Sequence, residues 1–254
     1  MAVSYMDFTS PDVQYTYDLR NNRMFAKDSG NVIYALGVQQ LNTLGNVSLL
    51  DIYLTKGNVV EPHIHQNASE LVYAIAGAAV VSLINPFTKQ VLPFPIGPGQ
   101  VANVPQGWIH WEVATEDGTH LLAIFDAPVP EFIGLSDFLR LAPRNVLAHT
   151  YCLDQATITE ALAPIKDTTV IGPPADCTQN HQPALAPEAM IHAQTGEQQP
   201  AQAARSPYGA YYGQPYYGQG PVQGYSQGYG YGQGYPVSYN QPYAYPGRQG
   251  YWGG

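Results

Sequence analysis

Three histidines and one glutamate are spaced along the chain in a way that suits a metal ion. His63 and His65 lie two residues apart, and side chains of an extended strand alternate between its faces, so both imidazoles point the same way. Glu70 follows a polar turn and begins an apolar run, from which a returning strand could bring its carboxylate back. His110 follows the turn at residues 105–107, on a third strand. The four side chains are therefore candidate ligands of a single ion.

The donor set indicates which ion and which chemistry to expect. Three neutral imidazoles and one carboxylate bind a five- or six-coordinate divalent cation and leave positions for water, dioxygen or a chelating small molecule. Nitrogen and oxygen donors without a thiolate favour Mn or Fe and permit Zn, Ni, Co or Cu. Such an ion can act as a Lewis acid, an orienting template or a redox centre. The other histidines are interpreted as ordinary surface or core residues: His120, His149, His181 and His192.

Two further glutamates lie close to these residues in sequence. Glu112 is two residues after His110, so a regular strand would direct it into the cavity beside the metal, where it could act as a base or proton donor. A bulge or a barrel edge would turn Glu112 to solvent instead. Glu61 is two residues before His63, but Pro62 disturbs the strand there. Glu112 is therefore a candidate catalytic residue with two alternative orientations.

The elements that must position these residues are short strands. Apolar and β-branched runs, punctuated by glycines, extend from Asn31 to about residue 128, as in a sandwich or a closed barrel. The run from Pro93 to Gly99 contains three prolines, which forbid a regular central strand there. We expect Glu116 to Gly118 to form the hairpin turn before the last strand.

The chain resembles the cupin family in two sequence motifs. The second motif departs only at its last position, where Ala114 replaces the usual asparagine. The resemblance implies an all-β fold, a jelly-roll barrel of the double-stranded β-helix type with short C-terminal helices. It also implies a divalent metal held by His63, His65, Glu70 and His110. The matching positions are Gly57, His63, His65, Glu70 and Gly77 in the first motif, and Gly99, Pro105, Gly107 and His110 in the second.

Within that family, the flanking segments are similar to oxalate decarboxylases and germin-like proteins. Val60 occupies the position where the decarboxylases have an arginine that binds the substrate carboxylate. The decarboxylases also have a lid segment with a proton-donating glutamate, and residues 128–134 stand in its place here. Glu131 is the nearest candidate acid in this segment, but in a different register. The similar flanks are residues 121–126, 135–139 and 143–148.

Three functional hypotheses follow. The leading one is a metal-binding cupin that acts as a decarboxylase or oxidoreductase on a small organic, carboxylate-like substrate, and the missing arginine favours a ligand less charged than oxalate. The second is a structural or assembly protein of a spore coat or similar layer, in which the barrel oligomerises and a tyrosine-rich tail self-associates. The third is a sugar isomerase with the same kind of ligand set. We expect a homo-oligomer with a small-molecule ligand at the metal.

Composition and charge argue against other classes of protein. The last fifty residues hold two of the ten basic residues and none of the nineteen acidic ones, so residues 1–204 carry a formal charge of −11. This acidic part lacks the basic clusters that bind nucleic acid or anionic membranes. The longest apolar run is shorter than the roughly 20 residues of a membrane-spanning helix.

The N-terminus has neither the basic start nor the apolar stretch of a secretory signal, which predicts a cytoplasmic protein. In that compartment Cys152 and Cys177 are expected to remain unpaired thiols. Beyond the barrel, Ser136 is expected to cap a helix over residues 137–142, and Asp154 or Thr157 to begin another that ends at Leu162.

The tail differs from the rest of the chain. Residues 205–254 hold 13 of the 20 tyrosines and 13 of the 25 glycines. Such a segment buries too little apolar area to offset its ordering entropy, so we expect it to be disordered in isolation. The predicted organisation is an N-terminal arm (1–30), the cupin barrel (31–128), a C-terminal helical extension (129–172), a linker (173–204) and the tail (205–254).

Overall fold

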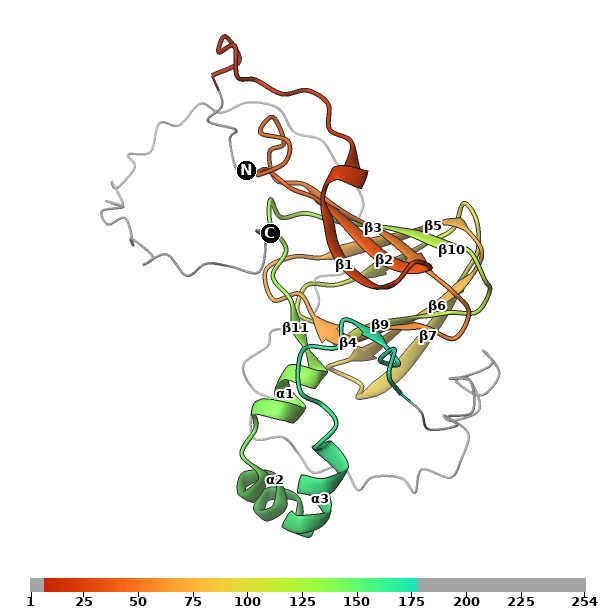
Figure 1. Cartoon of the computed structure of the whole chain (residues 1–254), viewed down its shortest axis with the longest axis vertical. Coiled ribbons are helices and arrows are strands. Elements are labelled where there is room, and N and C mark those ends of the chain that lie inside the picture. The colour runs from red at the N-terminus through yellow and green to blue at the C-terminus, as the bar shows by residue number, and fades with distance from the viewer. Residues whose placement is uncertain (1–6, 178–254) are drawn as a thin grey trace, which may run out of the picture. The chain divides into compact units, whose positions relative to one another are not determined.

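The computed structural model describes residues 7–177 (Figure 1). Most of the predicted linker and all of the tyrosine-rich tail lie outside this range, and so does the proposed self-association of the tail. Among residues 7–177, no helix is long and apolar enough to cross a membrane. Cys152 and Cys177 are both exposed and unpaired, as expected from the sequence.

Two antiparallel sheets form the body of the protein, which confirms the predicted all-β architecture. The first sheet has the order β1-β2-β3-β10-β5-β8 and the second the order β11-β4-β9-β6-β7, with β12 paired to β4. The strands of the first sheet are β1 (Arg23–Asp28), β2 (Asn31–Leu36), β3 (Ser48–Leu54), β10 (Thr119–Phe125), β5 (Glu70–Ala76) and β8 (Val101–Val104). Those of the second are β11 (Ile133–Gly134), β4 (Val59–Ile64), β9 (His110–Ala114), β6 (Ala79–Asn85) and β7 (Gln90–Ile96), together with β12 (Ile171–Gly172).

The hydrophobic core lies between the two sheets. Along β10, buried and partly buried residues alternate, as period-two strand geometry requires, and Leu121 and Phe125 reach the core. Val72 on β5 and Val81 on β6 join the same cluster from the two sheets. The apolar runs of the sequence therefore form the walls of one barrel interior.

The proline-rich run lies at the edge of a sheet. Pro93 and Pro95 belong to β7, which pairs only with β6 among the described strands. An edge strand tolerates proline because one row of its backbone N–H groups has no partner in the sheet. The prediction that this run forms no central strand is confirmed.

Gly77 shows why the first motif ends in glycine. It has a φ of +64°, and a Cβ atom there would lie 2.6 Å from the Cα of Thr119. A side chain would meet both backbone strain and a direct clash with β10, so only glycine fits this turn between β5 and β6.

The first strand begins earlier than the sequence analysis placed it. Residues 23–28, assigned to an N-terminal arm, form β1 and pair with β2 across two register irregularities. Met24 and Phe25 pack against the core, whereas Arg23 and Asp28 are exposed. Because β1 is an edge strand with one polar face, its composition resembles that of a loop.

The turn at Glu116–Gly118 is not a hairpin turn, which corrects the prediction. It joins β9 to β10, and these strands lie in different sheets. A hairpin and a crossover between facing sheets both use short polar turns with glycine, so the sequence does not separate them.

Three helices follow the barrel and lie together beyond β11 (Figure 1). They are α1 (Leu135–Leu141), α2 (Arg144–Tyr151) and α3 (Gln155–Leu162), and a short 3₁₀ helix, Leu19–Asn21, precedes β1. Asp154 caps α3 by accepting a hydrogen bond from the Thr157 backbone N–H at 2.8 Å, as predicted. Ser136 lies inside α1 and does not cap it, because its hydroxyl and backbone N–H bind the Glu61 carboxylate.

Candidate metal centre

The four predicted ligands reach the barrel interior from both sheets. His63 lies on β4, and His65 directly follows that strand. His110 begins β9 and is paired in register with His63. Glu70 begins β5 in the opposite sheet. All four side chains are at least 96% buried, so any charge in this pocket is poorly solvated.

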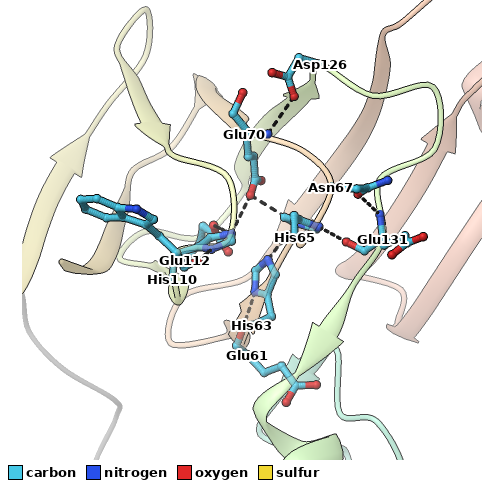
Figure 2. Close-up of polar contacts among 11 residues, drawn as sticks. Glu61, His63, His65, Asn67, Glu70, His110, Glu112, Asp126 and Glu131 are labelled. Atoms are coloured by element: carbon cyan, nitrogen blue, oxygen red, sulfur yellow. Dashed lines mark hydrogen bonds and ion pairs between the residues drawn. The ribbon is translucent and has the colours of Figure 1, made fainter. Parts of the chain in front are cut away.

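The ligand atoms of the four residues converge (Figure 2). The Nε2 atoms of His63 and His65 are 3.1 Å apart, and Glu70 Oε2 lies 2.7 Å from His110 Nε2 and 3.5 Å from His65 Nε2. All four atoms lie within 4.8 Å of one another. Two ligands at right angles, each about 2.1 Å from an ion, are about 3 Å apart, so these spacings suit one coordination sphere.

Backbone carbonyls determine which imidazole nitrogen carries the proton. Each Nδ1 lies within hydrogen-bonding distance of a carbonyl oxygen, so Nδ1–H donates and Nε2 is the nitrogen that faces the pocket. The three pairs are His63 with Glu61 (2.6 Å), His65 with Glu131 (2.6 Å) and His110 with Trp108 (2.9 Å).

This arrangement fits a cation better than it fits a hydrogen-bond network. With Nδ1 protonated, His63 and His65 direct two unprotonated Nε2 atoms at each other across 3.1 Å. Neither nitrogen can donate to the other in this tautomer, and their lone pairs repel. A positive ion bound by both nitrogens and by Glu70 removes that repulsion, so the donor set is suited to a divalent metal.

The electrostatics of the pocket reflect its burial. Burial and the nearby His110 and His65 lower the pKa of His63 well below its ordinary value. Burial alone would raise the pKa of Glu70, but the hydrogen bond from His110 and the proximity of His110 and His65 outweigh it and lower that pKa. Burial opposes a charge on His110, yet the hydrogen bond and charge of Glu70 raise its pKa to about 9. Without a metal, both shifts favour a protonated His110 in an ion pair with the Glu70 carboxylate.

Glu112 points into the barrel, as the regular-strand alternative predicted. The residue is 1% exposed, and neither carboxyl oxygen has a hydrogen-bond partner. Glu112 Oε1 lies 3.8 Å from His110 Nε2, beside the four-residue group. Burial, together with the charge of Glu70, raises the pKa of Glu112 to about 8. The strand is regular here because β9 pairs with β6 without interruption from Ala79 to Leu83.

Glu61 does not face the metal pocket. Its carboxylate accepts hydrogen bonds from the Ser136 backbone N–H, the Ser136 hydroxyl and the Val170 backbone N–H. The pairing of β4 with β9 shifts register between Val60 and His63, which removes the alternation that would have aligned Glu61 with His63. Glu61 meets the pocket only through its carbonyl oxygen.

Glu131 contacts the centre through its backbone. Its carboxylate is exposed and accepts a hydrogen bond from the Gln66 side chain at 2.8 Å, whereas its carbonyl accepts the one from His65 (Figure 2). The segment of residues 126–134, called the strap below, thus does not bring the predicted acid to the ligand atoms. The strap contributes Phe132 instead, whose ring stacks on His63 with centroids 4.8 Å apart. Phe132 was not among the residues predicted from the sequence, because no residue pattern marks it.

The wall of the pocket beside Glu112 is apolar. Val60 and Val81 lie opposite Glu112 in register on the two neighbouring strands, and both are buried. Within residues 7–177, the ion pairs made by arginine join Arg20 to Asp18 and Arg140 to Asp137, away from this wall. The position at which the decarboxylases have an arginine therefore provides no charge here.

Comparisons with known proteins agree with this fold. The family model described as Cupin matches residues 19–159. Germin-like protein 5-1 of Oryza sativa subsp. japonica is 29% identical over 133 residues, which cover 51% of this chain and 57% of that protein. Nectarin-1 of Nicotiana langsdorffii x Nicotiana sanderae is 32% identical over 149 residues, covering 54% and 64%. Glycinin G4 of Glycine max is 29% identical over 109 residues, covering 43% and 19%.

Solved structures show the same fold. A structure of oxalate decarboxylase aligns with a TM-score of 0.60 and 21% identity over 75% of this chain and 48% of that chain. The coconut allergen cocosin aligns with a TM-score of 0.56 and 23% identity over 62% of this chain and 43% of that one. The chain thus spans about half the length of the oxalate decarboxylase chain and about a fifth of glycinin G4.

Proposed function

The chain belongs to the cupin family, close to the oxalate decarboxylases and germin-like proteins, and on that premise we propose that it uses a divalent metal ion to transform a small organic substrate. His63, His65, Glu70 and His110 would hold the ion. One observation carries the proposal: three imidazoles, each fixed by a carbonyl at Nδ1, direct their Nε2 atoms toward one buried carboxylate.

Manganese or iron suits this donor set best, and zinc, nickel, cobalt or copper can replace them. When bound, such an ion supplies Lewis-acid or redox chemistry and a template for a chelating ligand. The protein itself supplies the rest. The buried walls exclude bulk water, Phe132 covers the imidazole of His63, and Glu112 places a carboxyl group beside His110 where it can accept or donate a proton.

We propose a decarboxylase or oxidoreductase that acts on a small carboxylate less charged than oxalate. The likeness to oxalate decarboxylase supports the class of reaction. The lack of a cation at Val60, with Glu112 opposite it, supports a smaller charge on the substrate, because a dianion would meet a second carboxyl group and no clamp.

Metal analysis tests the proposal. The purified full chain should contain about one equivalent of Mn or Fe per chain, since the four ligands define one site. The double variant His63→Ala, His65→Ala should contain none, because it loses two of the four donors. His149→Ala is the matched control, because His149 is exposed on α2, and it should retain the wild-type content.

Turnover is the second arm of the test. Small monocarboxylates, oxalate and an aldose should be incubated with wild type and with the double variant, with and without dioxygen. Metal-dependent consumption of a monocarboxylate supports the proposal, and consumption of the aldose alone would assign the isomerase alternative. A wild-type protein that binds no metal would refute the proposed function.

We also propose that the chain forms a homo-oligomer. Large apolar side chains are exposed on the C-terminal helices and just after α2. Exposed apolar surface of this kind normally packs against another protein surface. Light scattering of the purified chain should give a mass above that of one 27.6 kDa chain. The exposed residues are Phe138, Leu141, Val146, Tyr151 and Leu153.

A further inference from the structure

The three imidazoles of the centre are oriented in two different ways. His63 and His110 each donate from Nδ1 to the carbonyl two residues earlier in the same chain segment. These contacts form wherever the local backbone forms. His65 donates to the carbonyl of Glu131, which lies 66 residues later in the chain, on the strap. The orientation of His65 therefore depends on where the strap places one peptide group.

Asn67 fixes that peptide group. Its side-chain Nδ2 donates to the carbonyl of Val129 at 2.9 Å, and its Oδ1 accepts from the backbone N–H of Glu131 at 2.8 Å. One amide side chain thus pairs with a C=O and an N–H two residues apart on the strap, as a neighbouring strand would. Figure 2 shows the continuous path from Asn67 through the Glu131 backbone to His65.

Two other contacts join the same loop to the strap, but neither holds the Glu131 backbone. Gln66 binds the exposed carboxylate of Glu131, which lies at the end of the side chain and not on the backbone. Asp126, at the start of the strap, accepts from the Ser69 backbone N–H at 2.8 Å. Among the described residues of the loop at 66–69, Asn67 is therefore the one whose side chain positions the Glu131 carbonyl.

We propose that Asn67 is a positioning residue of the metal centre: it holds the Glu131 peptide so that the carbonyl orients the His65 imidazole and directs Nε2 at the ion. The proposal depends on the proposed function, since it concerns affinity for the metal assigned there. Asn67 is exposed and offers no ligand atom to the cluster, so its effect on the ion must pass through Glu131 and His65. Groups that orient a ligand histidine usually change metal affinity about 10- to 100-fold when they are removed.

Titration with Mn²⁺ or Co²⁺ alone tests the proposal on the full, metal-free chain. Asn67→Ala should bind either ion about tenfold more weakly than wild type. Gln66→Ala is the matched control: it removes a hydrogen bond to the same residue of the strap but leaves the backbone pair intact, and it should bind with wild-type affinity. Asn67→Asp keeps the acceptor for the Glu131 N–H and loses the donor to Val129. Its affinity for the ion should therefore lie between those of Asn67→Ala and Gln66→Ala.

Two readouts separate positioning from a merely structural role. The visible absorption spectrum of bound Co²⁺ reports the geometry of its ligands, and it should change in Asn67→Ala but not in Gln66→Ala. Thermal unfolding of the metal-free variants shows whether each folds, and if Asn67→Ala does not fold, Asn67→Asp carries the comparison.

The outcomes are distinct. If wild type binds one ion and Asn67→Ala binds it with equal affinity and an unchanged spectrum, the role of Asn67 is refuted while the proposed function stands. If Gln66→Ala weakens binding as much as Asn67→Ala, the specific role of the backbone pair is refuted. If wild type binds no ion, both proposals fail.

Discussion

Two buried glutamates on neighbouring strands have opposite surroundings. Glu61 on β4 is 6% exposed and accepts three hydrogen bonds, whereas Glu112 on β9 is 1% exposed and accepts none. A buried carboxyl group costs free energy unless hydrogen bonds replace its lost hydration. The Glu61 carboxylate therefore stabilises the fold. The Glu112 carboxyl group destabilises it, but lies beside the metal site, where it can transfer a proton.

The environment of Glu61 shows how closely the framework is fitted. A Cβ atom at Gly134 would lie 2.6 Å from Glu61 Oε1, so glycine is needed for the chain to approach the carboxylate. Glu112 instead faces Val60 and Val81 across the adjacent strands. Unpartnered buried groups of this kind are concentrated at functional sites, which is why we assign Glu112 to the chemistry.

The largest expected effect is from removing the Glu61 carboxylate. Glu61→Ala leaves three buried donors without an acceptor, so the free energy of unfolding should fall by about 3 kcal/mol or more. Urea unfolding of the full chain measures it. Glu61→Gln should lose less, because it keeps one acceptor oxygen, and Glu116→Ala on the exposed turn should lose nothing. Equal stability of Glu61→Ala and wild type would contradict the comparison.

Replacing Glu112 should have the opposite sign. Glu112→Leu fills a similar volume without a buried polar group, so the metal-free protein should gain about 2 kcal/mol in free energy of unfolding at neutral pH. The same variant should lose turnover, which separates stability from function. Glu116→Leu, at an exposed position, controls for the added apolar side chain. A destabilised Glu112→Leu protein would mean that Glu112 has a structural role.

A pH series makes the same comparison sharper. Burial raises the pKa of Glu112 from its ordinary value of 4.5 to about 8, so the folded protein holds a proton that the unfolded chain releases. The contribution of Glu112 to stability is therefore complete below about pH 4.5 and is lost as the pH rises to about 8. Metal-free wild type should lose stability relative to Glu112→Gln across this range in urea unfolding. If the free energies of unfolding of the two proteins changed in parallel with pH, the Glu112 carboxyl group would be solvated.

The smallest expected effect is from one hydrogen bond of the Glu61 cluster. Ser136→Ala removes the hydroxyl that donates to Glu61 at 2.9 Å and accepts from the Thr169 N–H at 3.1 Å. Two backbone donors still bind the carboxylate, so the loss should be about 1 kcal/mol. Urea unfolding beside Glu61→Ala tests it, and a loss as large as that of Glu61→Ala would mean that the hydroxyl alone holds the cluster.

The sequence predicts most where strands are regular and side chains act directly. His63, His65, Glu70 and His110 could be found because alternation and turn spacing determine where their side chains lie. Alternation left Glu112 with two orientations, and the uninterrupted pairing of β9 with β6 selects the inward one. The strand pattern indicated a sandwich or a closed barrel, and the resemblance to the cupins implied the jelly-roll class.

Other features depend on contacts that residue types do not reveal. Glu61 turns away from the metal pocket because of a register shift, which a period of two cannot anticipate. Glu131 contacts His65 through its carbonyl, a group that every residue has, so its residue type gives no sign of this contact. β1 is an edge strand with a polar face, and the turn at residues 116–118 could join strands of one sheet or of two.

The strand that carries His63 is bordered twice by the same later part of the chain. β11 pairs with β4 at His63 and Ile64, and β12 pairs with it at Val59 and Val60. The polypeptide between them, with all three helices, is thus a detour that leaves one strand and returns to it. α1 adds a third attachment, because Ser136 binds Glu61 of β4, so only the segment beyond α1 can be shortened or exchanged while all three attachments are preserved.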